Sequence, residues 1–210
     1  MLRERSSGTL GPVTAYRPSE HPRREPSMPG TSTAQLGMYI GLASLSVLFL
    51  ASLIGYFVTR YQNDSWRTAD LPNLPSGLWA SSVVLVFLSI ALRYGERRLL
   101  QNDRDGLRRG VTMALGAGAL FLVLQAANWR SVAAASLGTS AQTLYAFTFY
   151  MLTALHALHV LGGIVPLSVI YARAADYSSS RHEMVRLTRQ YWDFLLIVWV
   201  VLFASLGLSS

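Results

Sequence analysis

The sequence contains no cysteine and no lysine, and only 14% of its 210 residues are charged. Without cysteine the chain cannot form disulfides, zinc–thiolate sites, iron–sulfur clusters or a covalent C-x-x-C-H haem attachment. The charged fraction is well below the roughly 25% that is usual in soluble domains. Hydrophobic residues make up 51% of the chain, and the charged residues crowd into short gaps between long apolar runs. These features are typical of a membrane protein.

The net charge of +7 comes from eighteen arginines set against eleven acidic residues. Such a charge can indicate nucleic-acid binding. In this chain, however, the arginines flank apolar spans and form no continuous basic face. We therefore interpret them as topology signals beside membrane helices, and we expect no nucleic-acid partner.

Five apolar spans follow a polar N-terminal tail. A membrane helix needs ~20 apolar residues to cross a ~30 Å hydrocarbon layer, and a backbone in lipid must satisfy its hydrogen bonds internally. The sequence therefore predicts an all-α membrane protein, a bundle of five transmembrane helices. The predicted spans are residues 36–57, 77–94, 110–129, 143–172 and 191–208.

The chain divides into two predicted regions. Residues 1–34 are rich in proline, serine, glycine and arginine and lack the apolar run of a signal peptide, so we expect a disordered, basic cytoplasmic tail. Residues 35–210 form the predicted transmembrane domain. The fourth span is longer than one perpendicular crossing requires, and Pro166 predicts a bend in it.

The distribution of arginine predicts the orientation of the chain. Fifteen of the eighteen arginines lie in the tail, or in and beside the segments that follow the second and fourth spans. Only Arg60, Arg67 and Arg130 lie on the opposite side. The positive-inside rule therefore places the N-terminus and these two segments in the cytoplasm, and the C-terminus in the periplasm.

Few polar or ionisable residues lie within the spans, and those that do are functional candidates. His156 and His159 are spaced i, i+3 and share a face of the fourth helix. Two neighbours on one helix cannot approach one haem iron from opposite faces, and no other span contains a histidine. We therefore expect no haem or metal site in this chain. The predicted role of the two imidazoles is hydrogen bonding to neighbouring helices or to a partner subunit.

Five further residues are candidates for packing or partner contact. Asp193 lies one turn into the last predicted span and is interpreted as a helix cap, with proton handling as the alternative. Gln125 and Asn128 are predicted to form hydrogen bonds between helices. Gly37 and Gly41 form a G-x-x-x-G pattern, which permits close helix contact.

An intramembrane serine hydrolase is a further alternative. It would need Ser44 or Ser46 to meet His156 across two helices. No nucleophile elbow or glycine-rich oxyanion hole accompanies these serines. The sequence therefore predicts no catalytic residue.

The fourth and fifth spans carry the most distinctive motifs. Residues 145–160 read Y-A-F-T-F-Y-M-L-T-A-L-H-A-L-H-V, and residues 191–199 read Y-W-D-F-L-L-I-V-W. They resemble the T-G-x-H-G-x-H-V and Y-W-H-F-x-D-x-V-W helices of subunit III of the haem-copper terminal oxidases. Gly163 and Arg173 also follow His159 at the family's distances. Weaker matches extend the resemblance to the first three spans: Gly37-Met38, Tyr56, Leu74-Pro75, Leu124-Gln125-Ala126 and Trp129.

The chain departs from the family pattern at four positions. Leu45 and Asn128 stand where the family has glutamates. Asp193 stands in place of a histidine, and Leu196 in place of an aspartate. The scaffold therefore matches the family better than its buried charges do.

The resemblance implies the shorter, five-helix form of the family. Its function would be that of a non-redox accessory subunit of a bacterial haem-copper respiratory oxidase. The oxidase complex would lie in the inner membrane and oxidise cytochrome c or quinol. Its partners would be subunit I, which would hold the haem and copper, other oxidase subunits and phospholipid. By the same resemblance Arg173 would contact lipid phosphate, with an ordinary topology signal as the alternative.

Two other functions stay open at this point. A subunit III-like accessory protein of a nitric oxide reductase system would fit the lost glutamates. A small transporter would need a substrate site lined by polar residues within the membrane, and this chain has few.

Overall fold

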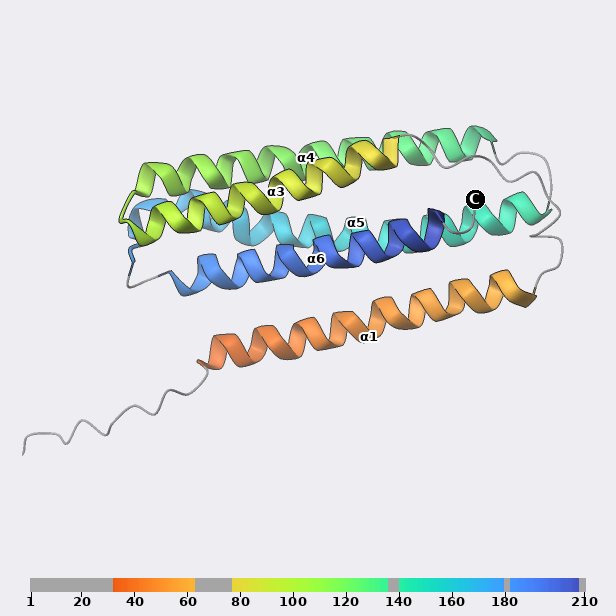
Figure 1. Ribbon diagram of the computed structural model, residues 1–210, viewed down its shortest axis with the longest axis horizontal. Coiled ribbons are helices and arrows are strands. Elements are labelled where there is room, and N and C mark those ends of the chain that lie inside the picture. Colours follow the sequence, from red (N-terminus) through yellow and green to blue (C-terminus); the bar gives the residue numbers. More distant parts are fainter. Residues whose placement is uncertain (1–31, 63–76, 136–139, 180–181, 208–210) are drawn as a thin grey trace, which may run out of the picture. The chain divides into compact units, whose positions relative to one another are not determined.

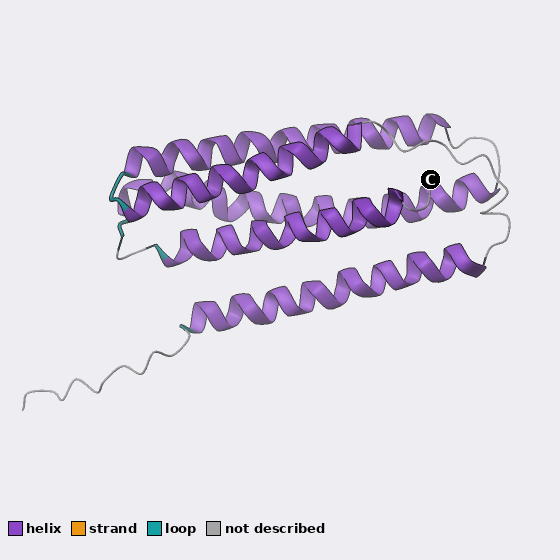
Figure 2. Cartoon of the chain, viewed as in Figure 1, coloured by secondary structure: helices purple, strands orange, loops and turns teal. Residues whose placement is uncertain are grey.

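The computed structural model describes residues 32–62, 77–135, 140–179 and 182–207. These residues form five long helices, α1 (Thr33–Gln62), α3 (Gly77–Leu100), α4 (Arg104–Ala135), α5 (Ser140–Ala172) and α6 (Glu183–Gly207), and the short 3-10 helix η1 (Ala174–Asp176) (Figure 1). No strand is present in this part of the chain (Figure 2). All five long helices are long and apolar enough to cross a membrane, which confirms the predicted all-α, five-helix architecture.

The helices extend beyond the predicted apolar spans. They contain 24 to 33 residues, which corresponds to about 36–50 Å at 1.5 Å per residue, against ~30 Å of hydrocarbon. The helices must therefore tilt or project from the bilayer. The predicted tail lies outside the described residues except for residues 32–34, of which Thr33 and Ala34 begin α1.

Helices α3, α4, α5 and α6 pack side by side, α3 and α5 each lying against both α4 and α6. Helix α1 lies beside α6 and α5 (Figure 1). Only Phe49 and Tyr56 are buried in α1. Most of the surface of α1 is therefore left for lipid or for another protein.

Two glycines bring α3 and α4 together. A Cβ atom at Gly110 would lie 2.7 Å from the Cα of Gly95 and 2.8 Å from the carbonyl oxygen of Ala91. Only a residue without a side chain permits this approach of two backbones. The contact between α3 and α4 thus depends on glycine at this position of α4.

A three-residue turn, residues 101–103, joins α3 to α4. Asn102 has a φ of 58°, a left-handed conformation that asparagine adopts more readily than most residues and that often ends a helix. The Asp103 carboxylate accepts a 2.8 Å hydrogen bond from the Gly106 amide, and so caps the first turn of α4.

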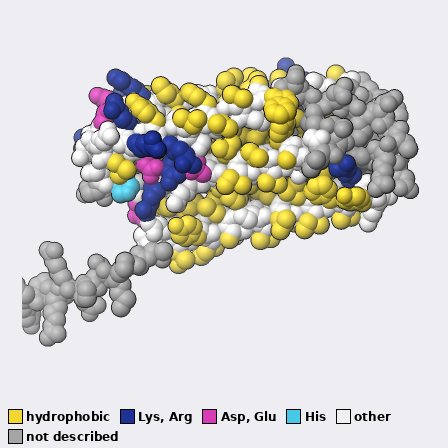
Figure 3. Space-filling model, viewed as in Figure 1, with side chains coloured by type: hydrophobic (Ala, Val, Ile, Leu, Met, Phe, Trp, Pro, Cys, Tyr) yellow, Lys and Arg dark blue, Asp and Glu magenta, His cyan; other side chains and the backbone are white. Residues whose placement is uncertain are grey.

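Side-chain contacts gather three chain segments at one end of the helices. The Ser32 hydroxyl, before α1, donates to the Glu183 carboxylate in the first turn of α6. The Ser179 amide, between η1 and α6, donates to the Asn102 side chain in the α3–α4 turn at 3.1 Å. The distribution of arginine predicted that these three segments lie on the same side of the membrane. Charged side chains also gather at this end of the helices (Figure 3). That this end is cytoplasmic stays a prediction.

Candidate functional site

His156 is completely buried and lies among aromatic rings from three other helices. Its ring centroid is 6.2 Å from that of Phe49 on α1, 5.6 Å from that of Phe121 on α4 and 5.1 Å from that of Trp199 on α6. Neither ring nitrogen has a hydrogen-bond partner among the described residues. Within the described residues the structure therefore shows ring contacts for His156 and no hydrogen bond to a neighbouring helix, and a hydrogen bond to a partner subunit stays a prediction.

His159 occupies a different environment one turn further along α5. Its Nδ1 atom lies 2.7 Å from the carbonyl oxygen of Leu155, on its own helix. The Tyr191 hydroxyl of α6 donates a 2.8 Å hydrogen bond to the carbonyl oxygen of His159. Close by, a Cβ atom at Gly163 would lie 2.9 Å from ring atoms of Tyr191 and Trp192. The matched histidine and glycine thus lie where α5 meets α6.

The two polar residues of α4 differ in their hydrogen bonding. Gln125 is 1% exposed, and neither atom of its amide group has a partner among the described residues. Asn128 donates to the Ser81 hydroxyl of α3 at 3.5 Å, the upper limit for a hydrogen bond. The expected link between helices is therefore found for Asn128 and not for Gln125. An additional link that was not predicted joins α4 to α5, in which the Trp129 indole donates to the Thr153 hydroxyl at 2.9 Å.

Asp193 joins α6 to α3 through a charged network. Its carboxylate accepts hydrogen bonds from the Ser89 hydroxyl at 2.5 Å and from the Arg93 guanidinium at 3.0 Å. Arg189, one turn earlier on α6, donates to the same carboxylate at 2.7 Å. The Arg189 guanidinium also lies 2.5 Å from the Glu96 carboxylate. Five residues of two helices thus share two negative and two positive charges.

The interpretation of Asp193 as a helix cap is wrong. Helix α6 begins at Glu183, ten residues before Asp193, so no free backbone amide is near. The predicted apolar span begins only at residue 191, because the preceding turns of α6 carry arginines and are not apolar. Arginine is nevertheless a good helix former, so the helix itself begins earlier. The i, i+4 spacing of Arg189 and Asp193 was the sequence signal for the ion pair.

Gly37 and Gly41 of α1 face away from the rest of the described chain. A Cβ atom at Gly37 or Gly41 would meet nothing within 4 Å. These glycines therefore make no close helix contact within the described chain. The hydroxyls of Ser44 and Ser46 donate to backbone carbonyls of α1 itself. The structure does not bring either serine to His156 in the arrangement that a hydrolase would need.

Arg173 is exposed at the C-terminal end of α5, directly before η1. Its neighbour Tyr177 packs toward the start of α6, where the phenol hydroxyl lies 3.0 Å from the Met184 sulfur. Burial raises the pKa of the Tyr177 phenol, although the charge of Arg173 acts in the opposite direction. The predicted contact of Arg173 with lipid phosphate stays a prediction.

No group of three or more histidine, aspartate or glutamate side chains within the described ranges is arranged to hold a metal ion. The His156 and His159 rings share one helix, as the sequence predicted, and both contact Phe49. That the chain binds no haem or metal stays a prediction.

Comparison with known proteins matches the whole helical part of the chain. Residues 31–208 match the family model described as cytochrome c oxidase subunit III. Cytochrome c oxidase subunit 3 of Synechocystis sp. is 31% identical over 173 residues, which cover 80% of this chain and 72% of that protein. The subunit 3 proteins of Thermostichus vulcanus and Corynebacterium diphtheriae are 27% and 25% identical, over 81% and 88% of this chain and 85% and 92% of their own lengths. Since the match spans all five helices and both motif-bearing segments of α5 and α6, the chain belongs to the cytochrome c oxidase subunit III family.

Proposed function

We propose that the chain is a non-redox accessory subunit of a bacterial haem-copper respiratory oxidase, a multi-pass protein of the inner membrane that packs against the haem- and copper-bearing subunit I. The observation that carries the proposal is the family match over residues 31–208. The bacterial relatives described above are named as subunits of cytochrome c oxidase, which favours an oxidase over a nitric oxide reductase system or a transporter.

The surface that we propose for partner contact is on α1. Membrane helices associate through close backbone approach at small residues, because lipid removes the hydrophobic drive that joins helices in water. Gly37 and Gly41 supply such a surface, and within the chain it is open. The aromatic rings around His156 link α1, α4, α5 and α6 inside the chain. These contacts hold α1 in position, so that its outer face is available to a partner subunit.

We further propose that Arg173 contacts the phosphate of a bound phospholipid, as the family resemblance implies. Its exposed position at the end of α5 supports this role, because an arginine at the membrane surface can donate several hydrogen bonds to a phosphate.

The test is purification in mild detergent through a tag on this chain, from cells that express the oxidase, followed by a difference spectrum and mass spectrometry of the partners. We expect a haem-copper subunit I to copurify. Recovery of a monodisperse chain without a haem-protein partner would overturn the proposal and favour the transporter.

A pair of variants tests the surface itself. Replacing both Gly37 and Gly41 by leucine should reduce recovery of subunit I while the chain keeps its helical circular dichroism. The control is Ala43→Leu, which is exposed on α1 but lies six residues from Gly37, about 240° around the helix axis. Equal losses in the control and the double variant would show that this glycine surface is not the contact.

A further inference from the structure

His159 presents an unpaired hydrogen-bond acceptor where α5 borders α1. Its Nδ1 atom lies 2.7 Å from the Leu155 carbonyl oxygen. A carbonyl only accepts hydrogen bonds, so Nδ1 carries the proton, and in the neutral ring the other nitrogen, Nε2, is then an acceptor. Nε2 has no partner among the described residues, and they do not enclose it as they enclose both ring nitrogens of His156. The half-buried His159 ring thus offers Nε2 at the surface of the chain.

This acceptor lies deep in the membrane-spanning part of the chain. Helix α5 runs from Ser140 to Ala172, so His159 is about 20 Å or more from either end at 1.5 Å per residue. Water hydrates polar groups at the ends of a membrane helix but not near its centre, where an unpaired polar group is costly. The acceptor of His159 therefore needs a donor, and the described part of the chain supplies none.

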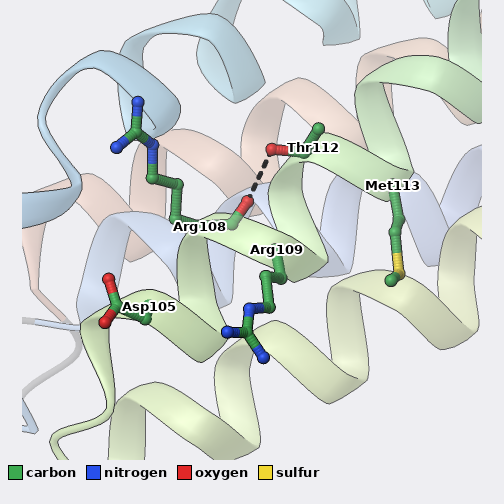
Figure 4. Close-up of a pocket in the computed structure, with 5 residues that line it drawn as sticks. All are labelled: Asp105, Arg108, Arg109, Thr112 and Met113. Carbon is green, nitrogen blue, oxygen red and sulfur yellow. Dashed lines mark hydrogen bonds between the residues drawn. The ribbon is translucent and has the colours of Figure 1, made fainter.

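The polar groups at the ends of the helices are in a different situation. Arg108 and Arg109 border a cavity of about 510 Å³ at the start of α4. Their side chains leave α4 in different directions (Figure 4), so they converge on no common ligand. Near the end of a membrane helix, water can also hydrate their guanidinium groups. These arginines thus indicate no partner, whereas the acceptor of His159 does.

The surface beside His159 leaves space for another helix. Gly162, one turn later on α5, is exposed, and a Cβ atom there would meet only the Tyr191 hydroxyl, at 3.9 Å. A glycine in such a position lets a second backbone approach closely. On the α1 side, the ring centroid of Phe49 lies 5.2 Å from that of His159. We refer to His159 and Gly162, with the adjoining side of α1, as the α1–α5 edge.

The α1–α5 edge adjoins the glycine surface that we propose for partner contact. At 100° per residue, Gly41 lies about 80° around α1 from Phe49, which faces the histidines of α5. Gly41 lies about 140–180° from Ser46 and Leu50, which line a groove together with α6. A helix packed on the glycine surface is therefore on the α5 side of α1, next to His159.

We propose that a transmembrane helix of the partner subunit packs over the α1–α5 edge and donates a hydrogen bond to Nε2 of His159 from a hydroxyl, amide or indole side chain. The donor belongs to a protein, because an acyl chain carries none and lipid headgroups lie at the membrane surface. The inference rests on the proposed function, since it assigns a contact to the same partner.

The first test measures the affinity of the purified chain, in detergent, for an oxidase from which this subunit has been removed. His159→Phe keeps a ring beside Phe49 but removes the acceptor. It should bind about threefold more weakly, the factor that corresponds to ~0.6 kcal/mol for a hydrogen bond between membrane helices. The matched control is His159→Gln, whose amide oxygen can accept the same hydrogen bond and should recover part of the affinity.

Two outcomes of this measurement would overturn the proposal. One is an unchanged affinity in His159→Phe. The other is an equal loss in both variants, which would assign the effect to ring packing. If no haem-protein partner is recovered with the unmodified chain, the proposed function fails. If the partner is recovered and His159→Phe binds it normally, this inference fails alone.

Photo-crosslinking tests the same surface without changing His159. The photoreactive residue p-benzoylphenylalanine replaces Leu158, which is 63% exposed and lies one turn before Gly162 on the same face of α5. In the oxidase complex it should crosslink to the haem-bearing subunit. The control places the same residue at Val83, which is 68% exposed on α3, a helix that packs on α4 and α6. Crosslinks from position 158 to lipid alone, or equal capture of the partner from both positions, would overturn the proposal.

Discussion

A methyl group added at Gly110 should separate α3 from α4. The new Cβ atom would lie 2.7 Å from the Cα of Gly95 and 2.8 Å from the Ala91 carbonyl oxygen, whereas carbon atoms pack best at about 3.5–4.0 Å. The obstructing atoms belong to the backbone of α3, so no side chain can rotate away. Overpacking of this kind costs ~1–3 kcal/mol, and the gain in helix propensity from glycine to alanine offsets ~1 kcal/mol of it.

A second glycine of α4 supplies the control. A Cβ atom at Gly116 would meet nothing within 4 Å, so Gly116→Ala gains the same helix propensity without the clash. The difference between the free energies of unfolding of Gly116→Ala and Gly110→Ala therefore contains no contribution from helix propensity. It equals the cost of overpacking at Gly110, ~1–3 kcal/mol. Gly95→Ala, whose nearest neighbour would be the Leu107 carbonyl oxygen at 3.4 Å, should fall between them.

The free energy of unfolding can be measured for each variant in detergent micelles, by titration with sodium dodecyl sulfate followed by circular dichroism. The expected order of stability is Gly116→Ala, then Gly95→Ala, then Gly110→Ala. If Gly110→Ala were as stable as Gly116→Ala, the close contact between α3 and α4 would not exist in the membrane protein, and the reasoning would be refuted.

Three other predictions concern the charged network, the orientation and the absence of haem. Asp193→Asn removes the carboxylate that two arginines share. Because these groups are partly exposed, we expect the free energy of unfolding to fall by ~1–2 kcal/mol in the same assay. Asp176→Asn, at an exposed carboxylate outside the network, should change that free energy little, and equal effects of the two substitutions would contradict this account. Reporter fusions should read periplasmic at Ser76, Ser136 and Ser210 and cytoplasmic at Asp103 and Ser179. A cytoplasmic signal at the C-terminus would reverse the orientation. The purified chain should show no Soret band, and a band lost in His156→Ala or His159→Ala would prove that prediction wrong.

The sequence by itself determined the helical architecture and the family. A lipid-exposed backbone must bond within its own segment, so a long apolar run specifies a helix without reference to any other part of the chain. The motifs around His159 and Trp192 are likewise local, since each is contained within one helix. Antiparallel crossings then group alternate connections at one end, as the contact between Ser179 and Asn102 shows.

The tertiary structure alone decided which residues meet. Gly37 and Gly41 carry the spacing of a packing motif and face open space, whereas Gly106 and Gly110, with the same G-x-x-x-G spacing, lie against α3. The partners of His156 come from three other helices, and those of Asp193 extend to α3. Spacing along one helix specifies which residues share its face. The partner of that face depends on the rotation and depth of each neighbouring helix, which only the packed bundle sets.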